Sequence, residues 1–232
     1  MRLDKFLSNT GTASRRDAAK AIRAGKVCVN GTIAKNADTD IDENNDVVTY
    51  SGERIAYSRF VYIMLDKPTG VVSATEDGDL TVIDLLPERE QKLGLFPCGR
   101  LDKNTTGFVL LTNDGELSHR LLSKKNHAEK VYSFTVKFPL SNEDCAALRA
   151  GVDIGGYVTK PCELSLQSEC EGTITLTEGK YHQIKLMMEA RHNKITSLRR
   201  ISFAGIALDQ TLNFGGWRYL TDEEIAVLRG NF

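Results

Sequence analysis

The chain has no long hydrophobic stretch. Its longest uninterrupted apolar run, residues 60–65, is six residues long, whereas a membrane-spanning helix needs ~18 or more. No apolar segment follows the charged residues after Met1, so we find no secretory signal. Low-complexity tracts and internal repeats are absent, and the composition is 41% hydrophobic and 26% charged. These features exclude disordered and membrane-embedded proteins and predict a folded cytoplasmic protein.

Cysteine pairs and metal-binding motifs are also missing. A structural zinc site needs three or four clustered ligands, and unpaired cysteines are typical of reduced intracellular thiols. The sequence therefore predicts neither a metal site nor a disulfide framework, and it carries no dinucleotide-binding or phosphate-loop signature. The five cysteines are scattered without a C-x-x-C pair: Cys28, Cys98, Cys145, Cys162 and Cys170.

Charge is balanced over the whole chain but not along it. The net charge is -1, yet residues 36–60 carry six acidic side chains against two basic ones. Such a sharp change predicts a small N-terminal unit with a basic face, suited to nucleic acid. Residues 1–35 carry two acidic side chains against eight basic ones: Arg2, Lys5, Arg15, Arg16, Lys20, Arg23, Lys26 and Lys35.

The local pattern of this first unit predicts two short helices and a hairpin. Leu3, Phe6 and Leu7 follow helical spacing, and Ser14 with an acid three residues later is typical of a helix start. On the second helix, a cationic row able to follow phosphates faces away from the apolar side: Arg16, Lys20 and Arg23. Asn30-Gly31 between alternating valines predicts a tight β-hairpin.

The remaining residues, 60–232, alternate strand-like and helix-like stretches. Consecutive strands with a few helices predict an α+β fold with a mostly antiparallel sheet. We expect strands at 61–65, 95–101, 108–111, 131–138, 163–166 and 173–177, and helices at 116–122, between 141 and 151, at 183–190 and from 221.

A polar loop between two apolar strands, residues 99–107, holds a carboxylate among cations. Asp102 stands beside Arg100 and Lys103, with the Thr105 hydroxyl nearby. A carboxylate in such company stays ionised at neutral pH, as a nucleophile must. The alternative is structural, since the aspartate could pair with Arg100 or form an Asx turn that shapes the loop.

Three further places combine charge with apolar surroundings. Strand alternation puts Lys130 and Tyr132 on one face, where a cation and a phenol could share a cleft, although a half-buried tyrosine is the commoner outcome. Lys185 precedes Leu186 and Met187, so it is a candidate for a partly buried lysine that needs a carboxylate partner. Residues 198–201 likewise place two arginines beside apolar side chains.

The N-terminal segment resembles an S4 domain, an RNA-binding module of ribosomal and RNA-modifying proteins. The resemblance implies an S4-like RNA-binding domain over residues 1–58, with RNA contacts from Arg2, Lys5, Arg15, Arg16, Lys20, Arg23 and Lys26. It rests on Arg2-Leu3-Asp4-Lys5-Phe6-Leu7, Ser14-Arg15-Arg16 and Lys26-Val27-Cys28-Val29-Asn30-Gly31.

Residues 59–232 resemble the catalytic domain of the RsuA-type pseudouridine synthases. The motifs occur in family order: Lys67-Pro68-Thr69-Gly70, Gly99-Arg100-Leu101-Asp102, Lys130-Val131-Tyr132, Gly179-Lys180-Tyr181-His182-Gln183-Ile184-Lys185, and Leu198. The chain departs from the usual pattern at Lys103 and Asn104, where many relatives carry an apolar residue and Asp, and at Leu186, where a second cation is usual.

This resemblance implies the roles of the site residues. Asp102 would act on the ribose, Lys185 would pair with it, and Tyr132 would stack on the flipped base and help to remove the C5 proton. Leu198 would close the apolar floor, and Arg100 would lie near the flipped nucleotide. The reaction is an isomerisation, so no cofactor is implied.

The resemblance also implies a substrate. The wording of the basic motif is most similar to the branch that modifies small-subunit (16S) ribosomal RNA, as free RNA or in an assembling particle. We expect a monomer without membrane partners. Two alternatives stay open: a synthase acting on large-subunit ribosomal RNA, and a non-catalytic S4-type ribosome assembly factor.

Overall fold

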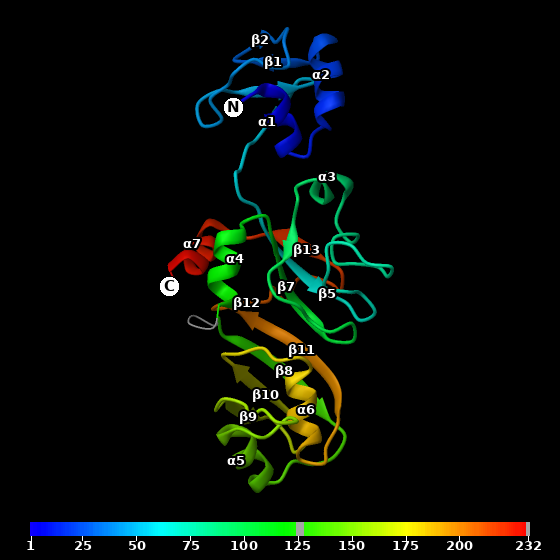
Figure 1. Ribbon diagram of the computed structural model, residues 1–232, viewed down its shortest axis with the longest axis vertical. Helices are drawn as coiled ribbons and strands as arrows, with labels where there is room; N and C mark the ends of the chain where they lie inside the picture. The colour runs from blue at the N-terminus through cyan, green and yellow to red at the C-terminus, as the bar shows by residue number, and fades with distance from the viewer. Residues whose placement is uncertain (124–127, 231–232) are drawn as a thin grey trace. The chain divides into compact units, whose positions relative to one another are not determined.

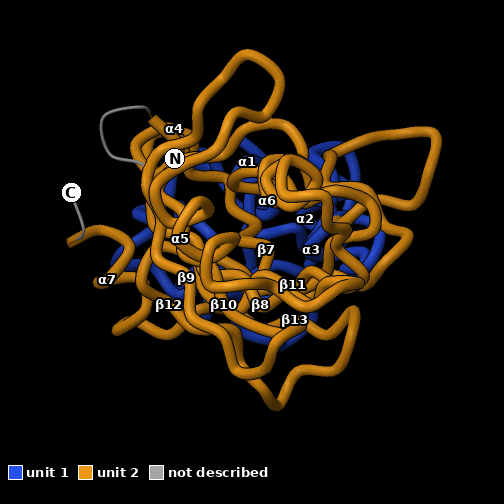
Figure 2. The backbone as a smooth tube through the Cα atoms, turned by 90° about the horizontal axis from the view of Figure 1, so that it is seen from below, with its two compact units in different colours: residues 1–61, 83–95 blue, residues 62–82, 96–232 orange. Residues whose placement is uncertain are grey.

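The computed structural model describes residues 1–123 and 128–230, which form two compact units (Figures 1 and 2). Unit 1 comprises Met1–Val61 and Ile83–Leu95, and unit 2 comprises Tyr62–Val82 and Phe96–Phe232. The sequence placed the boundary after residue 58 and did not indicate that residues 83–95 belong with the first unit. That segment carries the short helix α3, Glu88–Gln91. No helix within the described ranges has the length and apolar character needed to cross a bilayer.

Unit 1 confirms the helices and the hairpin that the sequence predicted. The Ser14 side chain caps α2 by accepting from the Asp17 backbone N–H at 3.2 Å. Asn30 and Gly31 both have positive φ angles, 51° and 80°, as a tight hairpin turn requires. The elements are α1 (Leu3–Asn9), α2 (Arg15–Arg23), β1 (Val27–Val29), β2 (Thr32–Ile33), β3 (Val48–Tyr50) and β4 (Glu53–Ile55), with sheet order β2-β1-β3-β4.

The core of unit 1 explains why its cations face outward. Leu3, Phe6 and Leu7 of α1 are at most 1% exposed and pack with Ile22 and other apolar residues of α2 and the sheet. The helix α2 turns its apolar stripe inward, so the opposite side of this helix is left to solvent. All seven predicted RNA contacts are exposed side chains: Arg2, Lys5, Arg15, Arg16, Lys20, Arg23 and Lys26.

Unit 2 is built on one sheet, which holds nine strands among the described residues. Its main path is β13-β5-β7-β11-β8-β10-β9, with β6 on β7 and β12 on β11. Every pairing is antiparallel except that of β7 with β11, so the predicted α+β fold is confirmed. The strands are β5 (Tyr62–Lys67), β6 (Phe96–Pro97), β7 (Thr106–Thr112), β8 (Lys130–Val136), β9 (Glu163–Leu166), β10 (Glu171–Leu176), β11 (Ile195–Phe203), β12 (Ile206–Ala207) and β13 (Trp217–Tyr219).

The predicted helices of unit 2 are all present. The side chains of Ser141 and Asp144 form a full capping box at the start of α5. The helices are α4 (Gly115–Leu122), α5 (Asn142–Ala150), α6 (Gln183–Glu189) and α7 (Asp222–Gly230).

Several strand assignments differ from the sequence-based prediction, which also missed the short strands β12 and β13. The expected strand at 95–101 is only β6, because the chain turns at Gly99, whose φ is 78°. Lys67, expected in a turn, is the last residue of β5. The nine-residue strand β11 was not predicted at all; its polar residues are held by pairing with β7 and β8 on both sides, which overrides local propensity.

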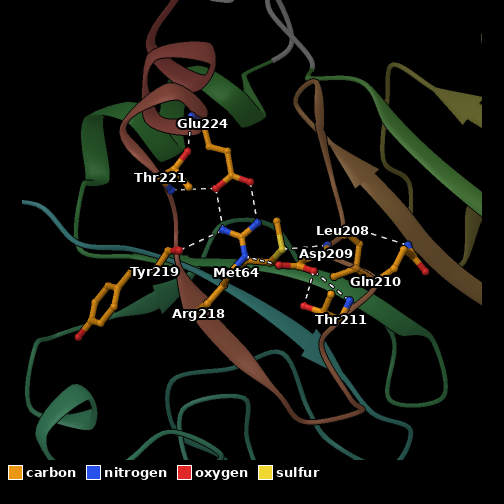
Figure 3. Close-up of polar contacts among 9 residues, drawn as sticks. All are labelled: Met64, Leu208, Asp209, Gln210, Thr211, Arg218, Tyr219, Thr221 and Glu224. Atoms are coloured by element: carbon orange, nitrogen blue, oxygen red, sulfur yellow. Dashed lines mark hydrogen bonds and ion pairs between the residues drawn. The ribbon is translucent and has the colours of Figure 1, made fainter.

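An arginine network fixes the edge strand β13 (Figure 3). Arg218 donates to both carboxylate oxygens of Glu224 at 2.8 Å and to Asp209 at 2.7 Å. Hydrogen bonds from Thr211, together with the Arg218 charge, lower the pKa of Asp209 to about 2. Glu224 also accepts from the Thr221 backbone N–H at 2.9 Å. The network therefore ties β13 to the first turn of α7 and to the segment after β12.

Candidate active site

The polar loop between β6 and β7 is held at several points. Ser73 donates its hydroxyl to the Leu101 carbonyl at 3.0 Å and accepts from the Leu101 backbone N–H at 3.1 Å. After Asp102, the Lys103 carbonyl accepts from the Gly70 backbone N–H at 2.9 Å. Both neighbours of Asp102 in the chain are thus fixed, so the carboxylate is presented by a rigid loop.

A buried lysine holds the backbone of the same loop. Lys67 is fully buried and donates to the carbonyls of Pro68, Lys103 and Thr105 at 3.0, 3.1 and 2.9 Å. Burial lowers its pKa to about 8, although the nearby Asp102 charge acts in the opposite direction. The sequence pointed to the Lys67 motif only through resemblance. The signal that could have identified Lys67 as buried is its position directly after the apolar run 60–65 and Asp66, within the same strand.

Glycine is required where β7 approaches β11. Gly107 has a φ of 100°, and a Cβ there would overlap the Arg200 carbonyl oxygen. L-residues rarely adopt this conformation, so the loop can return into β7 only through a glycine. The close approach brings Leu198 and Arg200 of β11 to the wall of the site.

The carboxylate meets a lysine from a distant part of the chain. Asp102 Oδ2 lies 2.5 Å from Lys185 Nζ, although 83 residues separate them. The two side chains are 27% and 26% exposed, so the pair is accessible from solvent. His182 Nε2 lies 3.5 Å from the other oxygen, Oδ1. The sequence had left open whether the aspartate pairs with Arg100; the structure pairs it with Lys185.

Helix α6 places Lys185, and a buried glutamate holds the segment before it. Glu178, 3% exposed, accepts from the Tyr157 hydroxyl at 2.7 Å, the Lys160 backbone N–H at 3.0 Å and Gln183 at 2.7 Å. Burial alone would raise the pKa of Glu178, but these hydrogen bonds outweigh it and lower the pKa. The sequence pattern did not predict this network.

The predicted site residues line a single cleft of unit 2. Its volume is about 570 Å³. Tyr132 and Leu198 are 9% and 7% exposed and come from the adjacent strands β8 and β11, while the exposed Arg100 lies on the loop. The cleft contains all five residues predicted there: Arg100, Asp102, Tyr132, Lys185 and Leu198. Across residues 1–123 and 128–230, no group of three His, Cys, Asp or Glu could hold a metal ion.

Both units of the chain match families of known proteins. The RNA pseudouridylate synthase model matches residues 61–190, and the S4 domain model matches residues 1–47. An uncharacterized RNA pseudouridine synthase of Bacillus subtilis, YtzG, is 45% identical over 98% of both chains. The chain belongs to the RNA pseudouridylate synthase family. The predicted resemblance is therefore confirmed, including the S4 domain.

Two other relatives cover the chain almost completely. The ribosomal small subunit pseudouridine synthase A of Escherichia coli is 38% identical over 97% of this chain and 99% of its own. A crystal structure of a pseudouridylate synthase is 36% identical, with a TM-score of 0.70 over 98% of this chain and 99% of that one. The protein therefore shares the fold of that solved pseudouridylate synthase over both of its units.

Proposed function

We propose that this pseudouridine synthase isomerises a uridine to pseudouridine in small-subunit ribosomal RNA. The observation that carries the proposal is the ion pair of Asp102 and Lys185 beside Tyr132 in one cleft. The near full-length similarity to a ribosomal small subunit pseudouridine synthase supports the choice of RNA. Neither a large-subunit substrate nor a non-catalytic assembly role has comparable support. We place the reaction in the cytoplasm and assign it to a monomer.

The geometry supports a division of roles within the cleft. Asp102, held by its loop, either attacks the ribose C1′ or takes a 2′ proton, and the N1–C1′ bond breaks. Lys185 contacts the carboxylate directly and places a positive charge beside it. Tyr132 offers its ring to the base while the base turns, and Leu198 closes the apolar side. No water needs to be activated, so one carboxylate is sufficient, unlike the pair used in glycoside hydrolysis.

The target nucleotide must leave its RNA stack to reach the cleft. Extrusion costs a few kcal/mol of stacking and pairing, and RNA contacts elsewhere must offset that cost. We assign this role to the exposed cations of unit 1, whose row Arg16, Lys20 and Arg23 lies on the solvent side of α2. Arg100, exposed at the cleft, would contact the extruded nucleotide itself.

A tritium-release assay tests the reaction. The purified protein is expected to release tritium from small-subunit ribosomal RNA labelled at uridine C5, because that proton is lost when C5 bonds to the sugar. Mapping of pseudouridine in ribosomal RNA from a deletion strain identifies the position: one small-subunit site is expected to stay uridine. Loss of pseudouridine at a large-subunit position would contradict the proposed small-subunit substrate. A pseudouridine map identical to that of the parent strain would contradict the proposed reaction.

The basic face of unit 1 gives a separate prediction. Replacing Arg16, Lys20 and Arg23 by Gln is expected to weaken RNA binding. The slope of log K against log salt, which is negative, is expected to become shallower by up to ~2–3, because fewer counterions are released. Fluorescence titration at several salt concentrations measures both quantities.

The control for this prediction makes the same charge change elsewhere. Three exposed cations of unit 2 are replaced by Gln: Lys137, Arg149 and Lys194. This variant is expected to keep the slope of the unmodified protein. Equal slopes for all three proteins would place the RNA contacts outside the α2 row.

A further inference from the structure

Two buried cations, Lys130 and Arg200, belong to the cleft lining together with the residues whose roles are assigned above. Lys130 is 6% exposed and Arg200 is 1% exposed, and both belong to the cleft lining. Arg200 lies opposite Tyr132 in the β8–β11 ladder, and Lys130 shares the buried face of β8 with Tyr132. Both cations are more deeply buried than Asp102 and Lys185, whose side chains are 27% and 26% exposed.

The described residues provide no carboxylate partner for either of these two cations. Within the part of the chain that the structure describes, neither forms an ion pair with a carboxylate. Lys130 Nζ donates to the Ala128 carbonyl and Arg200 Nε to the Phe108 carbonyl, both at 2.7 Å. Arg200 Nη2 is buried and has no hydrogen-bond partner among residues 1–123 and 128–230. An orphaned guanidinium nitrogen in a cleft wall is costly unless a ligand completes it.

The two groups also repel each other. Burial, with the neighbouring Arg200 charge as a smaller cause, lowers the pKa of Lys130 to about 8, which leaves the amine mainly protonated at neutral pH. Burial raises the pKa of the nearby Cys98 thiol, so this group provides no counter-charge. Two like charges held together without a counter-ion indicate a place for an electron-rich group of the ligand.

The chemistry of the substrate shows which group arrives there. When a nucleotide is extruded, its phosphates stay with the RNA backbone, while the sugar and base enter the pocket. Asp102 marks the position of the sugar. Tyr132, Arg200 and Lys130 are neighbours on one face of the sheet, so the group that meets them is the uracil ring, whose electron-rich atoms are its carbonyl oxygens.

We propose that Arg200, with Lys130 beside it, is a catalytic residue that binds a uracil carbonyl oxygen and stabilises the charge of the departing base. When the C1′–N1 bond breaks, its electron pair stays with the base, giving a uracilate anion. Asp102 then either forms a covalent bond to C1′, which breaks when C5 attacks, or takes the 2′ proton of the sugar and later returns it. After the base turns, C5 bonds to C1′, the C5 proton leaves and N1 takes up a proton.

The inference rests on the proposed function, and it makes a distinct kinetic prediction. The full charge on the base exists only between bond breaking and bond formation, so the fixed cations contribute to the rate of the chemical step. Arg200→Met is expected to lower the single-turnover rate about 10²-fold, the effect of losing one such donor. RNA affinity is expected to stay within about twofold, since the contacts of unit 1 remain.

A leaving-group test separates this role from a structural one. An RNA with 5-fluorouridine at the target position has a more acidic base, whose anion needs less stabilisation. Chromatography of the labelled nucleotide measures the rate of N1–C1′ cleavage. The factor by which Arg200→Met lowers this rate is expected to be several-fold smaller with this RNA than with the uridine RNA. Lys130→Met is expected to lower the rate less than Arg200→Met does, and again less with 5-fluorouridine than with uridine. Arg200→Lys is expected to keep part of the rate that Arg200→Met loses.

The control is Arg149→Met. Arg149 also donates to a backbone carbonyl, that of Leu164 at 2.7 and 3.0 Å, but it is not part of the cleft. Equal losses with both RNAs would overturn the inference, as would full activity of Arg200→Met. If Arg200→Met fails to fold, Arg200→Lys and Lys130→Met test the inference instead. The rate loss of each variant with uridine RNA is then compared with its rate loss with 5-fluorouridine RNA. Failure of the unmodified protein to convert any ribosomal RNA would instead contradict the proposed function.

Discussion

Asp102→Asn is expected to abolish isomerisation, with a loss of ~10⁴-fold or more in the single-turnover rate. The amide can neither attack the sugar nor take a proton from it, and no second carboxylate of the described cleft lining lies in contact with Lys185. Tritium release from RNA labelled at uridine C5 measures the loss.

The loss is expected without unfolding or release of RNA. The loop is held through Ser73 and Lys67, which bond to its backbone rather than to the carboxylate. The melting temperature of Asp102→Asn is expected to fall by no more than about 4 °C, since only the partly exposed ion pair with Lys185 is lost. Its RNA dissociation constant is expected to match that of the unmodified protein. Asp79→Asn is the control, because Asp79 is an exposed acid paired with Lys103 at 2.6 Å. Turnover by Asp102→Asn would refute the assignment of the nucleophile or base.

Lys185→Met is expected to lower the single-turnover rate ~10²-fold or more, while RNA binding changes little. The methionine keeps the length of the side chain but removes the cation that lies 2.5 Å from Asp102. The pair is about one-quarter exposed, so its loss is expected to cost only ~1 kcal/mol of stability or less.

Two further variants test the Lys185 assignment. Lys185→Arg keeps the charge and is expected to recover part of the rate, whereas Lys194→Met, a change at an exposed lysine outside the cleft, is expected to have no effect. A purely structural lysine would not show this charge dependence. Full activity of Lys185→Met would mean that the carboxylate needs no cationic partner.

Local sequence rules were sufficient for α1, α2 and the hairpin of unit 1 and for the four helices of unit 2. The apolar spacing of α1, the Ser14 cap of α2, the hairpin at Asn30 and the capping box of α5 each depend on residues within a few positions of one another. Such interactions form with the same geometry wherever they occur, so their pattern predicts the element.

Long-range pairing limited the prediction elsewhere. The strand β11 contains Arg199 and Arg200, which locally favour an exposed segment, yet Arg200 is 1% exposed. The structure buries it because β7 and β8 pair on either side and Gly107 allows close approach. The predicted strand at 95–101 failed for the opposite reason, since Gly99 turns the chain before a longer ladder can form.

The sequence by itself determined which residue types were available: an aspartate in a polar loop, a tyrosine on a strand, a lysine in an apolar helix and a basic first unit. Only the tertiary structure decided that Asp102 meets Lys185 rather than Arg100, that the buried Lys67 bonds to the loop backbone, and that Arg200 and Lys130 lie beside Tyr132 in the cleft lining. The reason is physical. Chemical identity and short-range geometry are written into neighbouring residues, whereas a contact across 83 positions exists only after the sheet has formed and excluded water from its partners.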